Sequence, residues 1–254
     1  MSPYPAPTLR YERDAWRGGA GTLAAIDEVG RGALAGPVSV GVVLLAAHSK
    51  PAPMGVADSK LLTPQAREQL VPRIRRWAHD SAVGHASAAE IDQIGIIAAL
   101  RLAAERAVSQ LSTEPDWVLL DGNHDYLTAP AQQPLFEALD ADFDQRRWRC
   151  RVPVRTLIKG DLKCSSVAAA SVLAKTERDA ILIELGKLYP EYGFEFNKAY
   201  ASPRHLAALA EYGPSAVHRC SWNLPGLGGL SSEPDAAIVP MGDDDQVIAA
   251  GDIG

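Results

Sequence analysis

The chain has 254 residues, of which 47% are hydrophobic, and its formal net charge is −6. This length suits one sizeable domain with extensions or two small domains, and the composition is typical of a soluble globular protein. Residues 231–254 hold six acidic side chains and no lysine or arginine, which leaves 25 basic and 25 acidic side chains before them, so the charge does not exclude a nucleic-acid partner.

The cysteines and the apolar stretches exclude other classes. Cys150, Cys164 and Cys220 are odd in number and far apart, which predicts reduced thiols in a cytoplasmic protein and neither a disulfide framework nor a zinc site. Near Met1 there is no basic segment followed by an apolar segment, so we expect no secretory signal. Residues 32–49 are uncharged, but Pro37, the glycines and the valine-rich second half favour a buried strand over a membrane span.

Residues 1–20 carry three prolines near their start and predict a loose lead-in segment.

The first predicted strand ends at two carboxylates. Residues 23–26 form an apolar run that predicts a buried strand, and Asp27 and Glu28 follow it directly. Neighbouring side chains on a strand point to opposite faces, so these acids share a ligand only if the strand ends between them. The glycines after them predict such an end.

The turn after these acids holds Arg31 between Gly30 and Gly32, and residues 38–45 then predict a second strand. Glycines let a backbone approach a ligand closely and leave N–H groups free to donate. A cation beside paired acids suggests that phosphate and metal are handled together. The alternative is an ordinary hairpin with a charged tip.

The next segment predicts a loop, a helix and a strand. Asp58 and Lys60 lie in the loop, where a local ion pair is one interpretation. Thr63 and Pro64 predict a helix start, and the helix should run to about Trp77. Residues 82–86 predict a third strand, and Ser87 with Glu90 forms a capping box before the next helix. That helix should pack on the core through one apolar stripe: Ile97, Leu100, Ala104, Val108 and Leu111.

A second strand that ends in an acid comes next. Residues 117–120 predict a buried strand, and Asp121-Gly122 follows it, although aspartate before glycine is often only a turn residue. Residues 125–150 are interpreted, from the family that the chain resembles, as an insertion that holds a short hairpin or helix. Its arginines either meet a DNA backbone or belong to a solvated surface loop.

The last predicted strand also leads to an acid. Residues 152–158 predict a fifth strand, followed by Lys159-Gly160-Asp161. A helix should start at Ser165 or Ser166, and its alanines would let it pack close to a sheet. A helical segment is expected from about residue 192, with a helix start at residues 202–203. Residues 226–254 predict a disordered acidic tail.

Over about residues 22–225 the chain resembles the bacterial type 2 ribonucleases H (ribonuclease HII). The matching blocks are Asp-Glu-Val-Gly-Arg-Gly at 27–32 with Leu-Ala-Gly-Pro-Val at 34–38, Asp-Ser-Lys at 58–60, Asp-Gly at 121–122, Lys-Gly-Asp-x-Lys at 159–163 and His-Arg at 218–219. Two positions depart from the family pattern: Ala199 stands for glycine beside Tyr200, and Trp222 stands for phenylalanine.

The resemblance implies a ribonuclease H-like α/β fold, with a mixed five-stranded sheet flanked by helices and a small helical C-terminal segment. It implies a catalytic domain over residues 21–225 and assigns Asp27, Glu28, Asp121 and Asp161 to catalysis and metal binding. It also implies a set of substrate-binding residues: Gly30, Arg31, Gly32, Lys60, Lys163, Ser165, Tyr200, His218 and Arg219. In this family the lysine corresponding to Lys60 lies near the scissile phosphate, and the tyrosine corresponding to Tyr200 senses a deoxyribose.

The implied activity is endonucleolytic cleavage 5′ of a ribonucleotide, in RNA/DNA hybrids or at single ribonucleotides in duplex DNA, and the implied role is ribonucleotide removal. The products would carry 5′-phosphate and 3′-hydroxyl ends. The implied partners are these nucleic acids, with no membrane and with the protein as a monomer.

The chemistry of the acids supports a metal site independently. Four converging carboxylates repel one another unless divalent cations neutralise them. Oxygen ligands without a histidine–cysteine cluster favour Mg²⁺ or Mn²⁺ over zinc. Two such ions, about 4 Å apart, can activate water and neutralise a leaving oxygen. His124 and His218 are candidate helpers.

Two other classes remain open on the sequence alone. A nucleic-acid-binding module without catalysis would use Arg31, Lys60 and Lys163 to hold phosphates. A Mg²⁺-dependent phosphatase or nucleotide-binding enzyme would act on small molecules, but neither Gly-Lys-Ser/Thr in a phosphate loop nor a G-x-G-x-x-G motif opening a helix is present.

Overall fold

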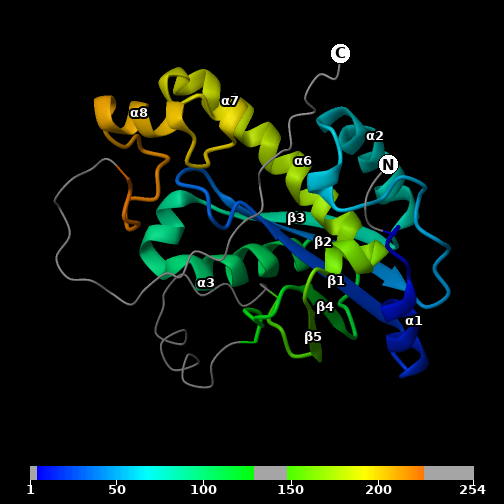
Figure 1. Cartoon of the computed structure of the whole chain (residues 1–254). Helices are drawn as coiled ribbons and strands as arrows, with labels where there is room; N and C mark the ends of the chain where they lie inside the picture. Colours follow the sequence, from blue (N-terminus) through cyan, green and yellow to red (C-terminus); the bar gives the residue numbers. More distant parts are fainter. Residues whose placement is uncertain (1–4, 129–147, 226–254) are drawn as a thin grey trace, which may run out of the picture.

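The computed structural model describes residues 5–128 and 148–225, and these form a mixed five-stranded sheet between layers of helices (Figure 1). The strand order is β3-β2-β1-β4-β5. β1 pairs antiparallel with β2, as β2 does with β3, whereas β1, β4 and β5 are parallel. The strands are β1 (Thr22–Val29), β2 (Val38–Ala46), β3 (Asp80–Ala86), β4 (Val118–Asp121) and β5 (Val154–Leu157). The predicted fold class is confirmed.

Helices cover both faces of the sheet. The α-helices are α1 (Arg10–Arg17), α2 (Pro64–Trp77), α3 (Ala88–Val108), α5 (Gly160–Lys163), α6 (Ser165–Leu188), α7 (Phe194–Asn197) and α8 (Pro203–Tyr212). Two 3-10 turns, η1 (Ser59–Leu61) and η2 (Pro190–Tyr192), complete the described elements. Figure 1 shows α3 on one side of the sheet and α6 on the other, with α1 and α2 on the α6 side.

The side chains of β1 alternate between the two layers. Ala24 and Ile26 pack in the core cluster that contains the α3 side chains, whereas Leu23 and Ala25 pack in a cluster with Val167 of α6. Both faces of this strand are buried, which explains why its sequence is a continuous apolar run and not an alternating one. The same alternation places Asp27 on the α6 side and Glu28 on the α3 side.

Two glycines allow the helices to lie close to the sheet. A Cβ atom on Gly41 of β2 would lie 2.3 Å from the carbonyl oxygen of Ala170 in α6. On the other face, a Cβ on Gly84 of β3 would lie 2.1 Å from the carbonyl oxygen of Ala103 in α3. Any side chain at these positions would force the helix away from the sheet.

The helix signals in the sequence are confirmed. Thr63 caps α2 by accepting a hydrogen bond from Ala66 N at 3.2 Å, and Ser87 and Glu90 form the predicted capping box at the start of α3. Ser202 caps α8 in the same way. Of the predicted apolar stripe, Leu100, Ala104 and Val108 are buried in the core, as predicted. Ile97 and Leu111 pack against the core only partly buried, and Leu111 lies beyond the end of α3. The fifth strand is shorter than the predicted run over residues 152–158, since only Val154–Leu157 pair with β4.

The loose lead-in predicted for residues 1–20 is wrong where the structure describes it. Arg10–Arg17 form α1, and Thr8 makes a bridge with Cys164. Glu12 is fully buried and accepts hydrogen bonds from Ser166 N at 3.1 Å and from Ser166 Oγ at 2.5 Å. The prolines end before this segment, so they do not oppose the helix, and its apolar side chains pack, partly buried, against the clusters formed by α6 and the sheet.

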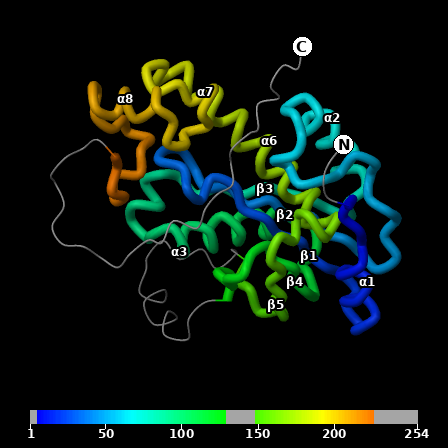
Figure 2. The backbone as a smooth tube through the Cα atoms, in the orientation of Figure 1, coloured from blue at the N-terminus to red at the C-terminus, as the bar shows by residue number. Residues whose placement is uncertain are grey.

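The C-terminal segment is helical, as predicted, and packs on the loop between β1 and β2. Ala33, Leu34 and Ala35 share a core cluster with Phe194 and Leu209. Figure 2 shows this loop reaching from the sheet toward α7 and α8. Leu34 N donates to Ala199 O at 2.9 Å, which joins the two segments.

Some expectations fall outside the described residues. Most of the predicted insertion lies in residues 129–147, and the predicted tail lies in residues 226–254. Among the described helices, none has the length and apolar character needed to cross a membrane.

Candidate active site

β1 continues through both of its acids, contrary to the prediction that it would end between them. Its antiparallel ladder with β2 pairs Asp27 with Gly41 and Glu28 with Val40. Its parallel ladder with β4, in contrast, ends where Ile26 pairs with Leu120. Beyond that point β1 has a neighbour on one edge only. Its other edge is open at the level where β4 ends in Asp121.

The two acids of β1 leave opposite faces of the strand and meet different supporting groups. Asp27 is only 5% exposed, and the hydroxyl of Ser171 in α6 opposes the rise in the pKa of its carboxyl group. On the α3 side, the hydroxyl of buried Tyr126 donates to Glu28 Oε2 at 3.3 Å. Arg31 approaches the other oxygen of Glu28, with Nη1 3.8 Å from Oε1.

The other two acids lie where β4 ends and where α5 begins. Asp121 is the last residue of β4, and its Oδ1 accepts a hydrogen bond from Gly160 N at 2.6 Å. Lys159 adopts a left-handed backbone (φ 56°), which turns the chain from β5 into α5. Asp161 follows in the first turn of α5.

The four carboxylates interact electrostatically. Burial, and then repulsion from Asp121 and Glu28, raises the pKa of Asp27 well above its ordinary value. Burial and repulsion from Asp121 raise the pKa of both Glu28 and Asp161 to about 7. Burial also raises the pKa of Asp121, although its hydrogen bonds with backbone N–H groups oppose the shift. The cluster therefore resists full ionisation unless positive charge is brought to it.

The chemistry of these donors fits divalent cations that prefer oxygen. In the described part of the chain, no three His, Cys, Asp or Glu side chains are arranged as a ready-made metal cage. Mg²⁺ is usually bound by one or two carboxylates together with water and substrate phosphates, so it does not need such a cage. Mn²⁺ also suits carboxylate and water ligands. Asp27, Glu28, Asp121 and Asp161 are the side chains that would hold such ions.

The η1 turn brings a further acid and a cation to the cluster. Asp58, 8% exposed, accepts a hydrogen bond from Lys60 N at 2.9 Å. Repulsion from Asp58 raises the pKa of Asp121 and Asp161, whereas the positive charge of Lys60 lowers both pKa values. The exposed Lys60 thus lies beside the acids, and its contact with a phosphate stays a prediction. The sequence pointed to Lys60 but did not assign Asp58 to the site.

The Gly30–Gly32 turn is held from behind by Arg219. This side chain is fully buried, and its guanidinium donates to Gly30 O and Arg31 O, each at 2.7 Å. It therefore fixes the turn and does not lie at the surface. The predicted direct contact of Arg219 with substrate is corrected to a supporting role.

Arg178, which the sequence did not single out, supports the same loop. It is fully buried and donates to Pro37 O at 2.9 Å and to Lys198 O at 3.1 Å. Gly30 has a positive φ of 84°, and a Cβ atom there would lie 2.0 Å from Arg178 Nε. Only glycine fits between the turn and this arginine.

Buried Arg219 occupies the carbonyl groups of Gly30 and Arg31, whereas the N–H groups of Arg31 and Gly32 stay available. Arg31 and Gly32 are exposed. Within the described residues, their N–H groups have no hydrogen-bond acceptor. These donors lie next to Glu28 and are available to a ligand.

His218 and Ser165 are also buried, so their predicted contacts with substrate are corrected. His218, 2% exposed, lies with Nε2 3.0 Å from Nε2 of His205, and its Nδ1 accepts from Ser215 N at 2.9 Å. His205 Nδ1 lies 2.9 Å from Tyr200 O, so the histidine pair supports the backbone of Tyr200. Ser165 Oγ donates to Pro7 O at 2.9 Å and anchors the N-terminal segment.

The remaining predicted residues lie nearer the surface. Tyr200 is half-buried, with the Arg178 guanidinium 5.7 Å from the centre of its ring. Lys163 is exposed and donates to Ile158 O at 2.6 Å. His124 is exposed. Sequence reasoning missed Ser171 and Tyr126, because each meets its acid across a long stretch of chain.

Comparisons with known proteins give one family. A family model described as Ribonuclease HII matches residues 24–224. The ribonuclease HII of Streptomyces coelicolor is 48% identical over 221 residues, which cover 87% of this chain and 85% of that protein.

Solved structures agree with this match. The ribonuclease H2 of Pyrococcus horikoshii has a TM-score of 0.60 and 26% identity, covering 80% of this chain and 94% of that one. The ribonuclease HII of Archaeoglobus fulgidus, solved in a complex with PCNA, has a TM-score of 0.58 and 26% identity, covering 79% of this chain and 93% of that one.

Proposed function

Because this chain belongs to the ribonuclease HII family and is therefore a ribonuclease H endonuclease, we propose that it cleaves on the 5′ side of a ribonucleotide. Its substrates are RNA/DNA hybrids and duplex DNA that contains single ribonucleotides, and the products carry 5′-phosphate and 3′-hydroxyl ends. Its role is the removal of ribonucleotides from DNA. Because the family is one of nucleases, this function is favoured over the two other classes that the sequence left open, a binding module without catalysis and an enzyme acting on small molecules.

The observation that carries this proposal is the set of four acids that repel one another at the open edge of β1. Asp27, Glu28, Asp121 and Asp161 hold two Mg²⁺ or Mn²⁺ ions during catalysis. When bound, such a pair supplies activation of the attacking water and neutralisation of the leaving oxygen. The raised pKa values of these carboxylates support the assignment, because a site built for cations holds more negative charge than it can keep without them.

Recognition of the ribonucleotide falls to the Gly30–Gly32 turn. A protein distinguishes RNA from DNA at one position mainly through the 2′-hydroxyl, which both donates and accepts hydrogen bonds. The N–H groups of Arg31 and Gly32 have no acceptor within the described residues, and they can donate to that hydroxyl without obstruction by a side chain at either glycine. Arg219 fixes the turn by donating to Gly30 O and Arg31 O, and Arg178 supports the loop that follows it by donating to Pro37 O.

Lys60 and Tyr200 contact the rest of the substrate. Lys60 is exposed next to Asp121 and Asp161, so its ammonium group can approach the scissile phosphate. Lys163, also exposed, approaches a neighbouring phosphate. Tyr200 stacks on the sugar that follows the ribonucleotide on its 3′ side, where a deoxyribose is preferred.

One chain supplies every residue of the proposed site, which supports a monomeric enzyme. The three cysteines form no disulfide, and Cys164 is buried as a free thiol. Reduced thiols support a cytoplasmic location.

Substitution of the acids tests the proposal. Asp27→Asn and Asp121→Asn should each lower turnover by several orders of magnitude at saturating Mg²⁺, because each removes a charged ligand. The fold should survive, since loss of one charge relieves repulsion in the cluster. Cleavage of a 5′-labelled duplex with one ribonucleotide, read together with the thermal midpoint, measures both effects. Near-normal cleavage by either folded variant would refute the proposed metal site.

A further inference from the structure

Two buried histidines, His205 of α8 and His218, join Tyr200 to the loop between β1 and β2. They are 0% and 2% exposed, and their Nε2 atoms lie 3.0 Å apart. Nδ1 of His205 lies 2.9 Å from Tyr200 O. At the other end, His218 forms a β-bridge with Ala35, which belongs to the same loop as the Gly30–Gly32 turn. The pair therefore connects the two segments proposed to contact the ribonucleotide and the sugar that follows it.

Backbone groups at the two ends determine the proton positions in this pair. The N–H group of Ser215 can only donate, and it donates to Nδ1 of His218 at 2.9 Å, so this nitrogen carries no proton. The proton of His218 is then on Nε2, and it is donated to Nε2 of His205. The single proton of His205 is on Nδ1 and is donated to Tyr200 O, which can only accept. The hydrogen bonds thus run in one direction, toward Tyr200.

The surroundings favour this neutral arrangement. The aromatic rings of Tyr192 and Phe194 pack against both histidines, with ring centroids between 4.7 and 6.0 Å away. Burial lowers the pKa of both histidines, and the neighbouring His205 adds to the shift of His218. A further proton on His205 would set two N–H groups against each other and break the bond between the rings.

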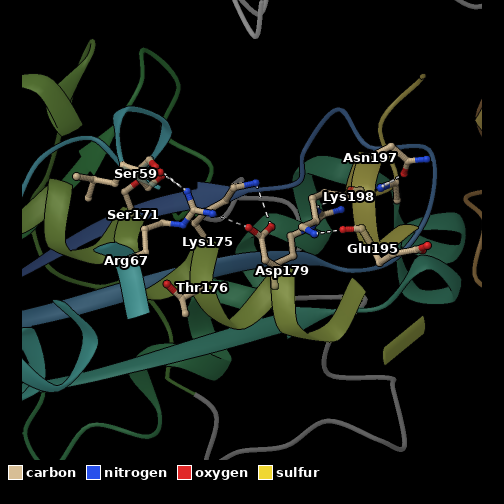
Figure 3. Close-up of polar contacts among 12 residues, drawn as sticks. Ser59, Arg67, Ser171, Lys175, Thr176, Asp179, Glu195, Asn197 and Lys198 are labelled. Atoms are coloured by element: carbon tan, nitrogen blue, oxygen red, sulfur yellow. Dashed lines mark hydrogen bonds and ion pairs between the residues drawn. The ribbon is translucent and has the colours of Figure 1, made fainter. Parts of the chain in front are cut away.

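The segment before Tyr200 has a backbone that needs support from its neighbours. Lys198 and Ala199 have φ values of 52° and 67°, which are uncommon for residues with a side chain. Figure 3 shows Asn197 and Lys198 in this segment, where the chain leaves α7. Asn197 Oδ1 accepts from Ala199 N at 2.7 Å, and Leu34 N donates to Ala199 O at 2.9 Å. Such a backbone persists where surrounding contacts determine it, and it is typical of functional sites.

The two hydrogen bonds to the carbonyl group of Tyr200 are not equivalent. Ser202 N donates to it at 2.8 Å, but Ser202 is only two residues away and moves with Tyr200. His205 is tied through His218 to the loop between β1 and β2. Only the bond from His205 therefore relates the position of Tyr200 to that of the Gly30–Gly32 turn.

We propose that His205 is a positioning residue that sets the preference for a deoxyribose on the 3′ side of the ribonucleotide. Its Nδ1–H group holds Tyr200 at a fixed separation from the Gly30–Gly32 turn, so that a ribose and the deoxyribose after it are recognised together. This inference rests on the proposed function, since it takes the turn as the contact to the ribose and Tyr200 as the contact to the next sugar.

Two amide variants separate the two ring nitrogens of His205. Asparagine places its amide nitrogen near the position of Nδ1, so H205N keeps a donor for Tyr200 O, whereas glutamine places it near Nε2, so H205Q loses that donor. The measured quantity is the ratio of kcat/KM for a single-ribonucleotide duplex to kcat/KM for a uniform RNA/DNA hybrid. H205Q should lower this ratio about tenfold, and H205N should keep it within about twofold of wild type. The metal site serves both substrates, so its contribution cancels in the ratio.

Two reference variants and one spectrum complete the experiment. Y200A gives the ratio expected when the contact to the sugar is lost. L209A is the control for stability: Leu209 lies one turn after His205 on α8 and is fully buried, so its loss should lower the thermal midpoint and leave the ratio unchanged. Nuclear magnetic resonance of the ring nitrogens in wild type reports the proton positions directly. We expect the protons on Nδ1 of His205 and on Nε2 of His218.

The outcomes separate this inference from the proposed function. A lower ratio for H205Q, with wild-type ratios for H205N and L209A, would support it. Equal ratios for H205Q and H205N would overturn it, and so would the opposite proton positions in the spectrum, which decides the question if H205Q does not fold. If Y200A lowers the ratio and H205Q does not, only the inference fails. If Y200A keeps the wild-type ratio, the proposed role of Tyr200 fails, and the inference fails with it.

Discussion

Substitution of Gly30 by alanine tests whether the turn beside the acids is fixed by Arg178. The new methyl group would meet two separate obstacles. The backbone at Gly30 has φ 84°, a conformation that costs an L-residue about 1–2 kcal/mol. The Cβ atom would also lie 2.0 Å from Arg178 Nε, which is far inside contact distance.

The second obstacle sets the magnitude. Arg178 is fully buried, so its guanidinium can move away from the new methyl only by giving up hydrogen bonds. Nε donates to Pro37 O at 2.9 Å and Nη1 donates to Lys198 O at 3.1 Å. A hydrogen bond to a charged group contributes about 1.5–3 kcal/mol. Loss of one of these bonds, added to the backbone cost, should lower the free energy of unfolding by about 2.5–5 kcal/mol, and loss of both should lower it by about 4–8 kcal/mol.

Gly19→Ala is the matched control. Gly19 has φ 100°, and a Cβ atom there would have no neighbour within 4 Å, so only the backbone cost of about 1–2 kcal/mol applies. Urea unfolding of both variants and of wild type gives the difference. Cleavage of a single-ribonucleotide duplex should fall for Gly30→Ala and stay normal for Gly19→Ala. Equal losses of stability in the two variants would refute the packing argument, because the contact with Arg178 would then contribute nothing.

Three further predictions concern the segment around Tyr200. Tyr200→Ala should reduce cleavage of a single-ribonucleotide duplex more than cleavage of a uniform RNA/DNA hybrid, and equal losses on both substrates would give Tyr200 a role in the fold alone. Ala199→Gly should raise the free energy of unfolding by about 1 kcal/mol, because Ala199 has φ 67° and glycine adopts this backbone without strain; a decrease in the urea midpoint would show that the buried methyl group matters more. Burial and the neighbouring His205 lower the pKa of His218 to about 4, below the 6.5 of a free histidine, so below pH 6.5 the unfolded chain takes up a proton that the folded chain does not. As the pH falls from 6.5 to 4, wild type should therefore lose about 3 kcal/mol more free energy of unfolding than His218→Gln does. An equal decrease in the free energy of unfolding of the two proteins over that pH range would contradict this.

Local signals in the sequence determined most of the secondary structure. Thr63 and Ser87 were identified as helix caps because each cap bonds an N–H group only three residues away. The apolar runs that became β1, β2 and β4 were recognisable because a strand buried on both faces has a short continuous apolar sequence. The acids Asp27 and Asp121 stood out for the same reason, since each directly follows such a run. These features need only a few neighbouring residues to be specified.

The lengths of the strand ladders were decided by the tertiary structure. Nothing near Glu28 in the sequence shows that β1 continues to Val29 along β2 while its pairing with β4 stops at Ile26. That difference depends on where β4 begins and ends, almost a hundred residues later. It opens one edge of β1, and it explains how two acids on opposite faces of a strand can both interact with Asp121.

The supporting groups of the site were also decided by tertiary structure. The sequence marked Arg219 and His218 by their place in a motif, but only the folded chain shows that both are buried. Arg219 holds two carbonyl groups of the Gly30–Gly32 turn. His218 contacts His205, which in turn contacts the carbonyl group of Tyr200. Ser171 meets Ser59 across 112 positions, and Tyr126 meets Glu28 across 98. Such contacts arise because the sheet brings distant segments to one edge, and a periodic pattern within a single segment carries no information about which segment lies opposite it.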